Sequence, residues 1–413
     1  MSHLTEKLNK SERRASGRGW LILPALAALF VCYLLLVWAS ASLSRRPGIA
    51  LLLNPWNVSA LLVRAEAALG QDPPDLDAAR RYAERALRAD PLAPGVHRTL
   101  AKVAEEANDE KAEAIFDQLA ARYARDGGAQ FAILQRAVAS RDFEEAANRV
   151  DLLFRGQAQG LWGRLAQALA HVIVEPDFAA SLARKLGQDP PWRRVFLEQV
   201  FARSPSVDAL LAFYSILPAP QDSESRLFLE RLVREGRYDA AHALFLRMLP
   251  PDRLEDAKLL YNARFQYGVS NLPFDWVITR MPNTLTDVRR DRNRRLLRVS
   301  FFGGRTPYRN VNHLMALAPG AYVFSGSEQA IAFNNPRGMR WRIFCMDRPN
   351  ENLATSGLLV GDIPQRPFDV SFTVPPDCPF QNLQLELAFR VALEQEATGS
   401  VVYSELSVAA VIQ

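Results

Sequence analysis

Hydrophobic and polar residues follow three different patterns along this chain of 413 residues. From Trp20 to Leu43 the chain runs for 24 residues without a charged side chain. From Trp56 to about Phe265, apolar residues recur three and four positions apart, and Pro and Gly gather in short clusters between these stretches. After Gly268, apolar and polar residues alternate, and Ala becomes rare. These patterns predict a multidomain α + β protein with a single transmembrane helix, a helical domain and an antiparallel β-domain, in that order.

The uncharged segment 20–43 is long enough to cross a bilayer as one helix. At about 1.5 Å per residue it exceeds the roughly 30 Å of the hydrocarbon core. Basic residues are frequent before this segment, whereas only Arg45 and Arg46 follow it closely. The positive-inside bias therefore predicts a cytoplasmic tail at 1–19 and places the bulk of the chain across the membrane. A cleaved signal peptide is the alternative, because Ala39-Ser40-Ala41 has the small-x-small form of a cleavage site.

The helical region, which we place at 56–267 after a linker at 44–55, contains several similar fragments. They share a small residue, an apolar residue four positions later and another three positions after that, and they occupy 76–91, 109–123, 141–153 and 236–250. This pattern resembles the second helix of a tetratricopeptide repeat. The spacings from Ala79 to Ala112 to Ala146, 33 and 34 residues, are close to the period of that repeat. We expect a solenoid of about six units, with no register assigned in 155–225, and an irregular helical bundle is the alternative.

The last part of the chain, 268–413, predicts an antiparallel β-sandwich of the jelly-roll type. We expect strands near 274–281, 295–302, 309–317, 320–327, 338–346, 367–374, 381–391 and 400–411. Alternation is clearest in LQLELAFRV, which places Leu383, Leu385 and Leu387 on one face. The same alternation in MRWRIF turns Trp341 toward the core.

Several motifs of this β-region resemble the carbohydrate-binding-module and galactose-binding-like jelly rolls. They are PFDWVI, VNHLMALAPGAYVFSG, RPFDVSFTVPP, LQLELAF and GSVVYSELSV, in this order. The resemblance implies glycan binding, although Ser404 and Glu405 stand where many members of these families carry an Asp pair. The whole arrangement also resembles a group of Gram-negative proteins associated with extracellular polysaccharide. That resemblance implies an inner-membrane protein whose bulk lies in the periplasm.

Flat aromatic rings and amides are the side chains that commonly contact sugars, and four residues are candidates for glycan binding. Tyr308, which we expect to be exposed in a loop, is followed by Asn310 and Asn312. Trp276 in PFDWVI is the fourth candidate, and a position in the core is its alternative.

A cluster of arginines gives this region a strong local positive charge, within a chain whose net charge is +5. The candidates for contact with an anionic partner are Arg289, Arg290, Arg292, Arg294 and Arg295, which we expect on a loop and the start of a strand. The partner would be lipid headgroups or an acidic polysaccharide, and not nucleic acid, because the domain faces away from the cytoplasm. A solvated edge that discourages strand-to-strand aggregation is the alternative.

Cys345 and Cys378 are the only plausible disulfide pair, because Cys32 lies within the predicted membrane segment. Both lie at strand ends, and the predicted compartment is oxidising. Two separate buried thiols are the alternative.

No catalytic, metal-binding or cofactor-binding motif occurs in the sequence. The zinc-protease, nucleophile-elbow, P-loop and dinucleotide patterns are absent, and the histidines are isolated from one another. We therefore expect a non-enzymatic membrane-anchored scaffold without metal or cofactor. Its helical repeats would bind protein partners and its β-sandwich would bind glycan, in assembly or export of a cell-surface polysaccharide. The alternatives are an envelope or secretion assembly factor without sugar binding, and a glycan-modifying enzyme with unrecognised carboxylates.

Overall fold

A computed structural model describes residues 31–43, 46–156, 159–292 and 294–411 of the chain. Residues 20–30 of the predicted membrane segment lie outside the described residues, as does the whole predicted cytoplasmic tail with its basic residues. Among the residues that are described, no helix is both long enough and apolar enough to cross a membrane. The chain divides into two compact units, of which the first reaches Phe196 and the second contains most of the remainder up to the C-terminus.

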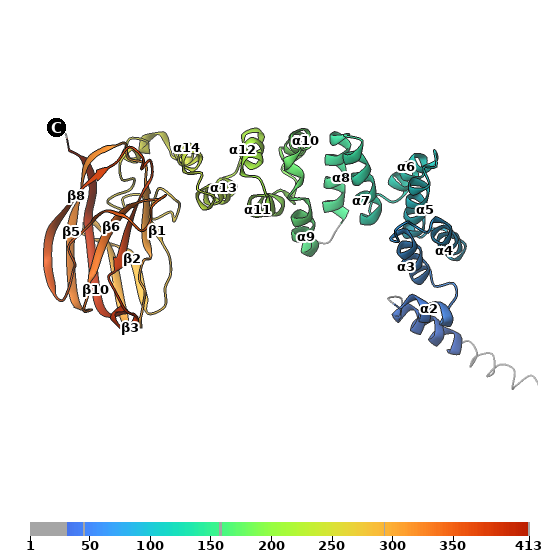
Figure 1. Cartoon of the computed structure of the whole chain (residues 1–413), viewed down its shortest axis with the longest axis horizontal. Coiled ribbons are helices and arrows are strands. Elements are labelled where there is room, and N and C mark those ends of the chain that lie inside the picture. Colours follow the sequence, from blue (N-terminus) through green and yellow to red (C-terminus); the bar gives the residue numbers. More distant parts are fainter. Residues whose placement is uncertain (1–30, 44–45, 157–158, 293, 412–413) are drawn as a thin grey trace, which may run out of the picture. The chain divides into compact units, whose positions relative to one another are not determined.

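The first unit is helical (Figure 1). Its α-helices are α2 (Pro47–Leu53), α3 (Val58–Leu69), α4 (Leu76–Ala89), α5 (Pro94–Glu106), α6 (Ala112–Arg122), α7 (Gly127–Ala139), α8 (Phe143–Gly156), α9 (Gln159–Leu169) and α10 (Pro176–Leu186). The 3₁₀ helix η1 (Val172–Val174) precedes α10. Asn57, Asp75 and Asp126 cap α3, α4 and α7, because each side chain accepts a hydrogen bond from a backbone N–H in the first turn. Helix α2 lies in the predicted linker, where Pro47 starts a short apolar helix that packs against α3.

The division between the units crosses α11 (Arg193–Arg203) and the end of α12 (Val207–Ile216). Helices α13 (Asp222–Arg234) and α14 (Tyr238–Met248) belong to the second unit. Two 3₁₀ helices, η2 (Pro251–Arg253) and η3 (Asp256–Lys258), follow them.

The helices alternate regularly along the chain. The helices α3, α5, α7, α9, α11 and α13 start 29 to 36 residues apart, and each is followed by a partner, α4, α6, α8, α10, α12 or α14. The described residues between Val58 and Met248 therefore hold six helix pairs, which agrees with the predicted number of units. The fragments predicted as second helices correspond to α4, α6, α8 and α14. In 155–225, where the sequence did not assign the repeat units, the structure has two helix pairs, α9 with α10 and α11 with α12.

The small residues of the repeat pattern are mostly buried where helices meet. Ala83 of α4, Ala146 of α8 and Ala241 of α14 have no exposed surface. Ala112 differs, since it is half-buried at the start of α6, where Phe116 and Leu119 supply the buried contacts.

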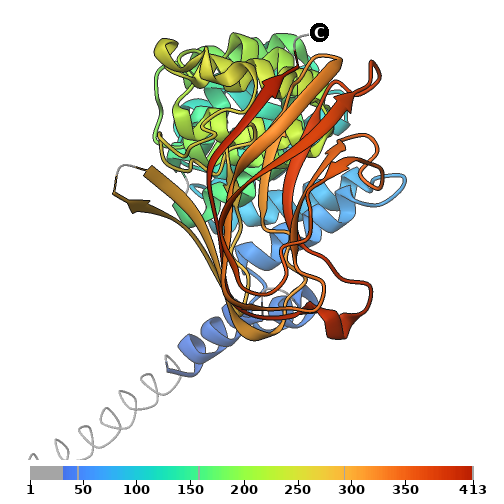
Figure 2. The same cartoon turned by 90° about the vertical axis from the view of Figure 1, so that its left-hand side faces the viewer.

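The second unit contains a sandwich of two antiparallel sheets over the described part of 277–410 (Figure 2). One sheet, which we call sheet A, has the order β1-β4-β9-β6-β7, and the other, sheet B, has the order β2-β3-β10-β5-β8. The strands are β1 (Val277–Ile278), β2 (Thr284–Asp291), β3 (Arg294–Arg305), β4 (Val311–Met315), β5 (Gly320–Asn334), β6 (Met339–Cys345), β7 (Asn352–Thr355), β8 (Ile363–Val374), β9 (Gln381–Leu387) and β10 (Glu396–Ala410). A 3₁₀ helix, η4 (Ala392–Gln395), precedes β10.

The strand order confirms the predicted jelly roll. Strands β3-β10-β5-β8 face β4-β9-β6-β7, so consecutive strands are distributed between the sheets as in a double Greek key. Each strand predicted from the sequence overlaps an observed one, and β2 and β7 were missed. Strand β2 falls in the arginine cluster, which we had expected to be a loop up to the start of β3. This expectation was wrong: Arg289, Arg290 and Asp291 continue β2 with exposed side chains, and an edge strand tolerates such charged residues.

The segment before the first strand contributes to the core of the sandwich. Leu260, Phe265 and Trp276 are buried in one cluster with Trp341 and Tyr403. Helix α14 packs beside this segment, with the ring of Phe245 5.7 Å from Phe274 and 5.4 Å from Tyr261. The sandwich therefore depends on residues before the predicted boundary at 268.

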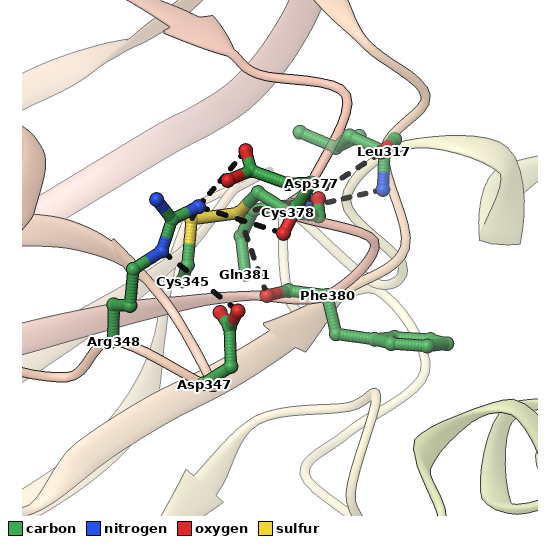
Figure 3. The surroundings of a disulfide bond; sticks show 8 residues. All are labelled: Leu317, Cys345, Asp347, Arg348, Asp377, Cys378, Phe380 and Gln381. Carbon is green, nitrogen blue, oxygen red and sulfur yellow. Dashed lines mark hydrogen bonds and ion pairs between the residues drawn. A yellow bond between two sulfur atoms is a disulfide. The ribbon is translucent and has the colours of Figure 1, made fainter.

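Cys345 at the end of β6 and Cys378 before β9 form a disulfide (Figure 3), the pair expected from the sequence. Their Cα atoms are 5.6 Å apart, within the usual range for a bridge. Gln381 fixes the neighbouring turn, because its amide nitrogen donates to the carbonyl oxygen of Cys378 and its Oε1 accepts from the N–H of Leu317. Arg348 pairs with Asp377 at 3.0 Å above the bridge.

Candidate functional site

The outer surface of sheet A carries a continuous group of polar side chains. Strand alternation turns the apolar residues of β4, β6 and β9 inward and leaves the intervening polar residues outside. We define the polar face as Arg309, Asn312, Arg340, Arg342, Gln384 and Glu386. The strand register sets Asn312, Gln384 and Arg342 side by side across three strands, and it places Arg340 opposite Glu386.

Glu386 is the most buried member of the polar face. Its side chain is only 3% exposed, and two arginines neutralise it. Arg340 donates to its Oε1 from Nε at 2.8 Å and approaches the same oxygen with Nη2 at 2.6 Å. Nε of Arg309 lies 3.5 Å from Oε2, which has no hydrogen-bond partner among the described residues. The carboxylate is thus held rigidly by the two arginines, and its Oε2 is buried.

The amide side chains of the polar face hold one another. Oδ1 of Asn312 accepts from Nε2 of Gln384 at 2.8 Å and from Nδ2 of Asn382 at 3.2 Å. Nδ2 of Asn312 donates to the carbonyl oxygen of Arg309 at 3.1 Å. Oδ1 of Asn382 is buried without a hydrogen-bond partner in the described part of the chain. These contacts fix the orientation of the amides before any ligand arrives.

Two aromatic rings lie beneath arginines on this side of the sandwich. The guanidinium of Arg342 is 4.4 Å from the ring centre of Phe344, and that of Arg309 is 5.5 Å from Phe389. Burial lowers the pKa of Arg342, and the neighbouring Arg309 and Arg340 lower it further against the opposing effect of Glu386. The result is a flat layer of guanidinium, amide and carboxylate groups, which can bond several hydroxyl groups of one ligand.

Of the four glycan-binding candidates from the sequence, only Asn312 lies on the polar face. Tyr308 was expected to be exposed, and this was wrong: it has no exposed surface. Its ring packs 5.4 Å from Phe301 and its hydroxyl bonds Oγ1 of Thr286 at 2.7 Å, and burial raises its pKa. The neighbours Pro307 and Arg309 point outward and Tyr308 points inward, so the loop follows the alternation of a strand.

Trp276 and Asn310 are also buried and unavailable to a ligand. Trp276 occupies the core, which was its alternative, and its Nε1 donates to the carbonyl oxygen of Asn262 at 2.9 Å. Asn310 is 6% exposed and its Nδ2 donates to Oγ1 of Thr279 at 2.9 Å. Both residues therefore support the structure around them.

The other members of the polar face were not predicted as ligand contacts from the sequence: Arg309, Arg340, Arg342, Gln384 and Glu386. The signal was present in MRWRIF and LQLEL, where polar residues occupy every second position. This alternation identifies the inward apolar face, and the polar residues at the intervening positions form the outward face.

The arginine candidates lie on one hairpin. Arg289 and Arg290 belong to β2, Arg294 and Arg295 belong to β3, and Arg292 lies in the turn between them. Arg290, Arg294 and Arg295 line a common cavity, whereas Arg289 pairs with Asp287 at 2.7 Å. In the described part of the chain, no group of three or more His, Cys, Asp or Glu residues is arranged to hold a metal ion.

Comparison with known proteins gives only distant similarities. No protein-family model and no curated protein matches the sequence. Among solved structures, the chain is similar to a CBM4 with 16% identity and a TM-score of 0.29, over 37% of this chain and 99% of the other. It is also similar to TmCBM61 in complex with β-1,4-galactotriose, with 8% identity and a TM-score of 0.23, over 36% of this chain and 96% of the other.

A third similar structure is not described as a carbohydrate-binding module. Pseudomonas aeruginosa pilF matches with 16% identity and a TM-score of 0.25, over 47% of this chain and 77% of the other. At scores this low, the likeness to these proteins carries no argument about function.

Proposed function

We propose that this protein is a non-enzymatic scaffold whose β-sandwich binds glycan through the polar face and whose helix pairs bind a protein partner. The observation that carries the proposal is the fixed layer of Arg, Asn, Gln and Glu side chains on the outer surface of sheet A. Sugars present many hydroxyl groups in a small area, each of which can donate and accept. A surface that offers fixed donors and acceptors close together satisfies them without reorganisation.

The helix pairs support the second half of the proposal. Several first helices of the pairs expose apolar side chains, including Val63 of α3, Phe131 and Val138 of α7 and Leu161 of α9, each 38 to 41% exposed. Apolar side chains that recur on equivalent helices are suited to bind an extended protein segment.

We further propose that segment 20–43 anchors the chain in a bacterial inner membrane, with the helix pairs and the sandwich in the periplasm. The uncharged run and the excess of basic residues before it support this arrangement. In this setting the scaffold would act in assembly or export of a cell-surface polysaccharide. A periplasm-active reporter enzyme fused after Ser44 should be active and one fused at Ser16 should not, and the opposite result would contradict the topology.

The glycan proposal is tested by the affinity of the full chain for an array of neutral and acidic bacterial glycans. The variant Gln384→Ala should weaken binding of the best ligand about tenfold, because one fixed amide with two polar atoms is lost. Gln329→Ala is the matched control, since Gln329 is also half-buried but belongs to β5 of sheet B. No binding on the array, or an equal loss in both variants, would contradict a role of the polar face. Release of shorter sugars from a bound glycan would contradict the non-enzymatic assignment.

A further inference from the structure

The hairpin of β2 and β3 opens a cavity at the edge of sheet B. Strand β10 pairs with β3 only as far as Ser404 opposite Leu296, and its pairing with β5 is irregular between Ser404 and Ser407. Glu405 lies in this irregularity with φ of +53°. The first residues of β3, Arg294 and Arg295, therefore have no β10 residue paired with them, and Figure 2 shows the hairpin standing out from its neighbours.

This cavity, which we call the arginine pocket, has a volume of about 430 Å³ and a strongly basic lining. It is lined by Arg264, Gln266, Arg290, Arg294, Arg295 and Glu405. Glu405 pairs with Arg264 at 3.4 Å, and Arg294 lies 3.7 Å from Asp291. Arg290 and Arg295 form no ion pair with any described residue. Two guanidinium groups in one pocket thus lack a counter-charge from the described protein.

A second cavity adjoins the arginine pocket and shares Arg295 with it. This edge cavity has a volume of about 660 Å³ and lies between the segment 268–271, the end of β1 and the strand β2. Val269, Ile278, Met281 and Val288 give it apolar surface, and Thr279, Arg280, Thr286 and Asp287 give it polar groups. The buried Tyr308 and Asn310 position two of these groups by bonding Thr286 and Thr279. The volume and the mixed lining suit a sugar ring, which has apolar C–H faces and polar edges.

We propose that the arginine pocket and the edge cavity together bind an acidic glycan. A carboxylate of the glycan would lie among Arg290, Arg294 and Arg295, and the adjoining ring would occupy the edge cavity. Arginine suits this role because its planar guanidinium bonds a carboxylate through two parallel N–H groups. The site is separate from the polar face, with which it shares no residue, and it goes beyond the glycan binding proposed for that face.

The test uses the full chain and oligogalacturonate, a glycan with one carboxylate on each ring, with calorimetric measurement of Kd at low and high salt. Arg295→Ala should weaken binding about tenfold or more, because Arg295 lines both cavities and a charge-assisted bond is lost. Arg295→Lys should retain part of the affinity. Binding should weaken as salt rises, and neutral galactose oligomers should not compete.

Arg292→Asn is the matched control, because it removes the same charge from the turn of the same hairpin but does not line either cavity, and Asn tolerates its φ of +53°. An equal loss in the Arg292 and Arg295 variants would mean diffuse attraction by the hairpin and would overturn the site. Binding to phosphatidylglycerol vesicles without binding to oligogalacturonate would overturn the glycan as ligand. Gln384→Ala should leave oligogalacturonate binding unchanged, and a tenfold loss in that variant would place this ligand on the polar face instead.

Discussion

Gly399 lies at a position of the described chain where the neighbouring backbone leaves no room for a side chain. It lies in β10 with φ of +86°, at an irregularity in the pairing between Thr398 and Ser400. A Cβ atom built on it would lie 2.0 Å from the carbonyl oxygen of Ala332, and this neighbour is backbone that cannot rotate away. Both the conformation and the close approach of β5 require glycine here.

We expect Gly399→Ala to lower the free energy of unfolding by about 2–4 kcal/mol, since it combines the left-handed backbone cost with an overpacked contact. Gly361→Ala is the control, because Gly361 has φ of +70° but no atom within 4 Å of its built Cβ. The control should lose only about 1–2 kcal/mol. Urea denaturation measures both values, and equal losses would show that the contact with Ala332 is relieved.

The candidate site was predictable only in part at this scale. Asn312 was identified because amides next to a loop suggest ligand contact, and it does lie on the polar face. Tyr308 was misplaced because a residue between Pro and Arg looks exposed, whereas its ring fills a space beside Phe301 that only the folded sandwich defines. Glu386 could not be paired with Arg340 and Arg309 from sequence, because their contacts depend on the register between strands.

At the scale of elements, the helix pairs depend on small residues at their crossings. We expect Ala83→Leu in α4 and Ala241→Leu in α14 each to lower the free energy of unfolding by about 1–3 kcal/mol, because both residues have no exposed surface and added volume overpacks the contact. Ala114→Leu in α6 is the control, since Ala114 is exposed. Thermal unfolding followed by circular dichroism measures the change. Unchanged melting of both buried variants would show that the crossings have room for a larger side chain.

Helix α14 links the stability of the second unit to pH. The ring of His242 lies 4.9 Å from Phe274 and 6.3 Å from Phe380, and burial lowers its pKa below the ordinary 6.5, with Asp239 acting in the opposite direction. The unfolded chain therefore binds more protons just below pH 6.5, and the folded state loses stability as the pH falls through this range.

We expect the wild-type protein to melt at a lower temperature at pH 5 than at pH 8, and His242→Phe to reduce this difference. The difference should not vanish, because burial also lowers the pKa of His313. Melting curves at the two pH values provide the measurement. An undiminished difference in the variant would mean that His242 is protonated equally in both states.

Helices and strands could be predicted where buried and exposed positions follow a regular pattern, and they were missed in β2 and β7, where burial is irregular. The alternation of β6 and β9 and the apolar spacing of α4 and α14 were sufficient to locate these elements. The end of strand β2 lies in a run of seven consecutive polar or charged residues, 289–295, which has no alternation. Its pairing with β3 becomes apparent only when the two strands are aligned. Strand β7 has four residues, too few for a periodic signal.

At the scale of the whole molecule, the disulfide fixes one end of the sandwich. The two cysteines are 33 residues apart in sequence, and closing a loop of this length restricts the unfolded chain. We expect the double variant Cys345→Ser with Cys378→Ser to lower the free energy of unfolding by roughly 3–4 kcal/mol in the chain-entropy model. Cys32→Ser is the control, since Cys32 is a free thiol. Equal stability of the double variant and the wild type in oxidising buffer would contradict a stabilising role.

The order of the helical region and the β-region followed from the sequence, because each has its own hydrophobic period. The boundary of the sandwich did not, since Leu260 and Phe265 belong to its core although they precede the change in period. Whether a residue is buried in the core of the sandwich depends on tertiary contacts with distant strands, and the local sequence pattern does not contain this information.

The position of β10 has a consequence for how the protein is made. This strand follows all the others along the chain, yet it lies at the centre of sheet B, between β3 and β5. A ribosome that has synthesised the chain only to η4 has produced β3 and β5 with no strand between them, so both present unpaired backbone edges. Sheet B can be completed only after β10 has been translated, and until then the unpaired edges of β3 and β5 need protection from aggregation.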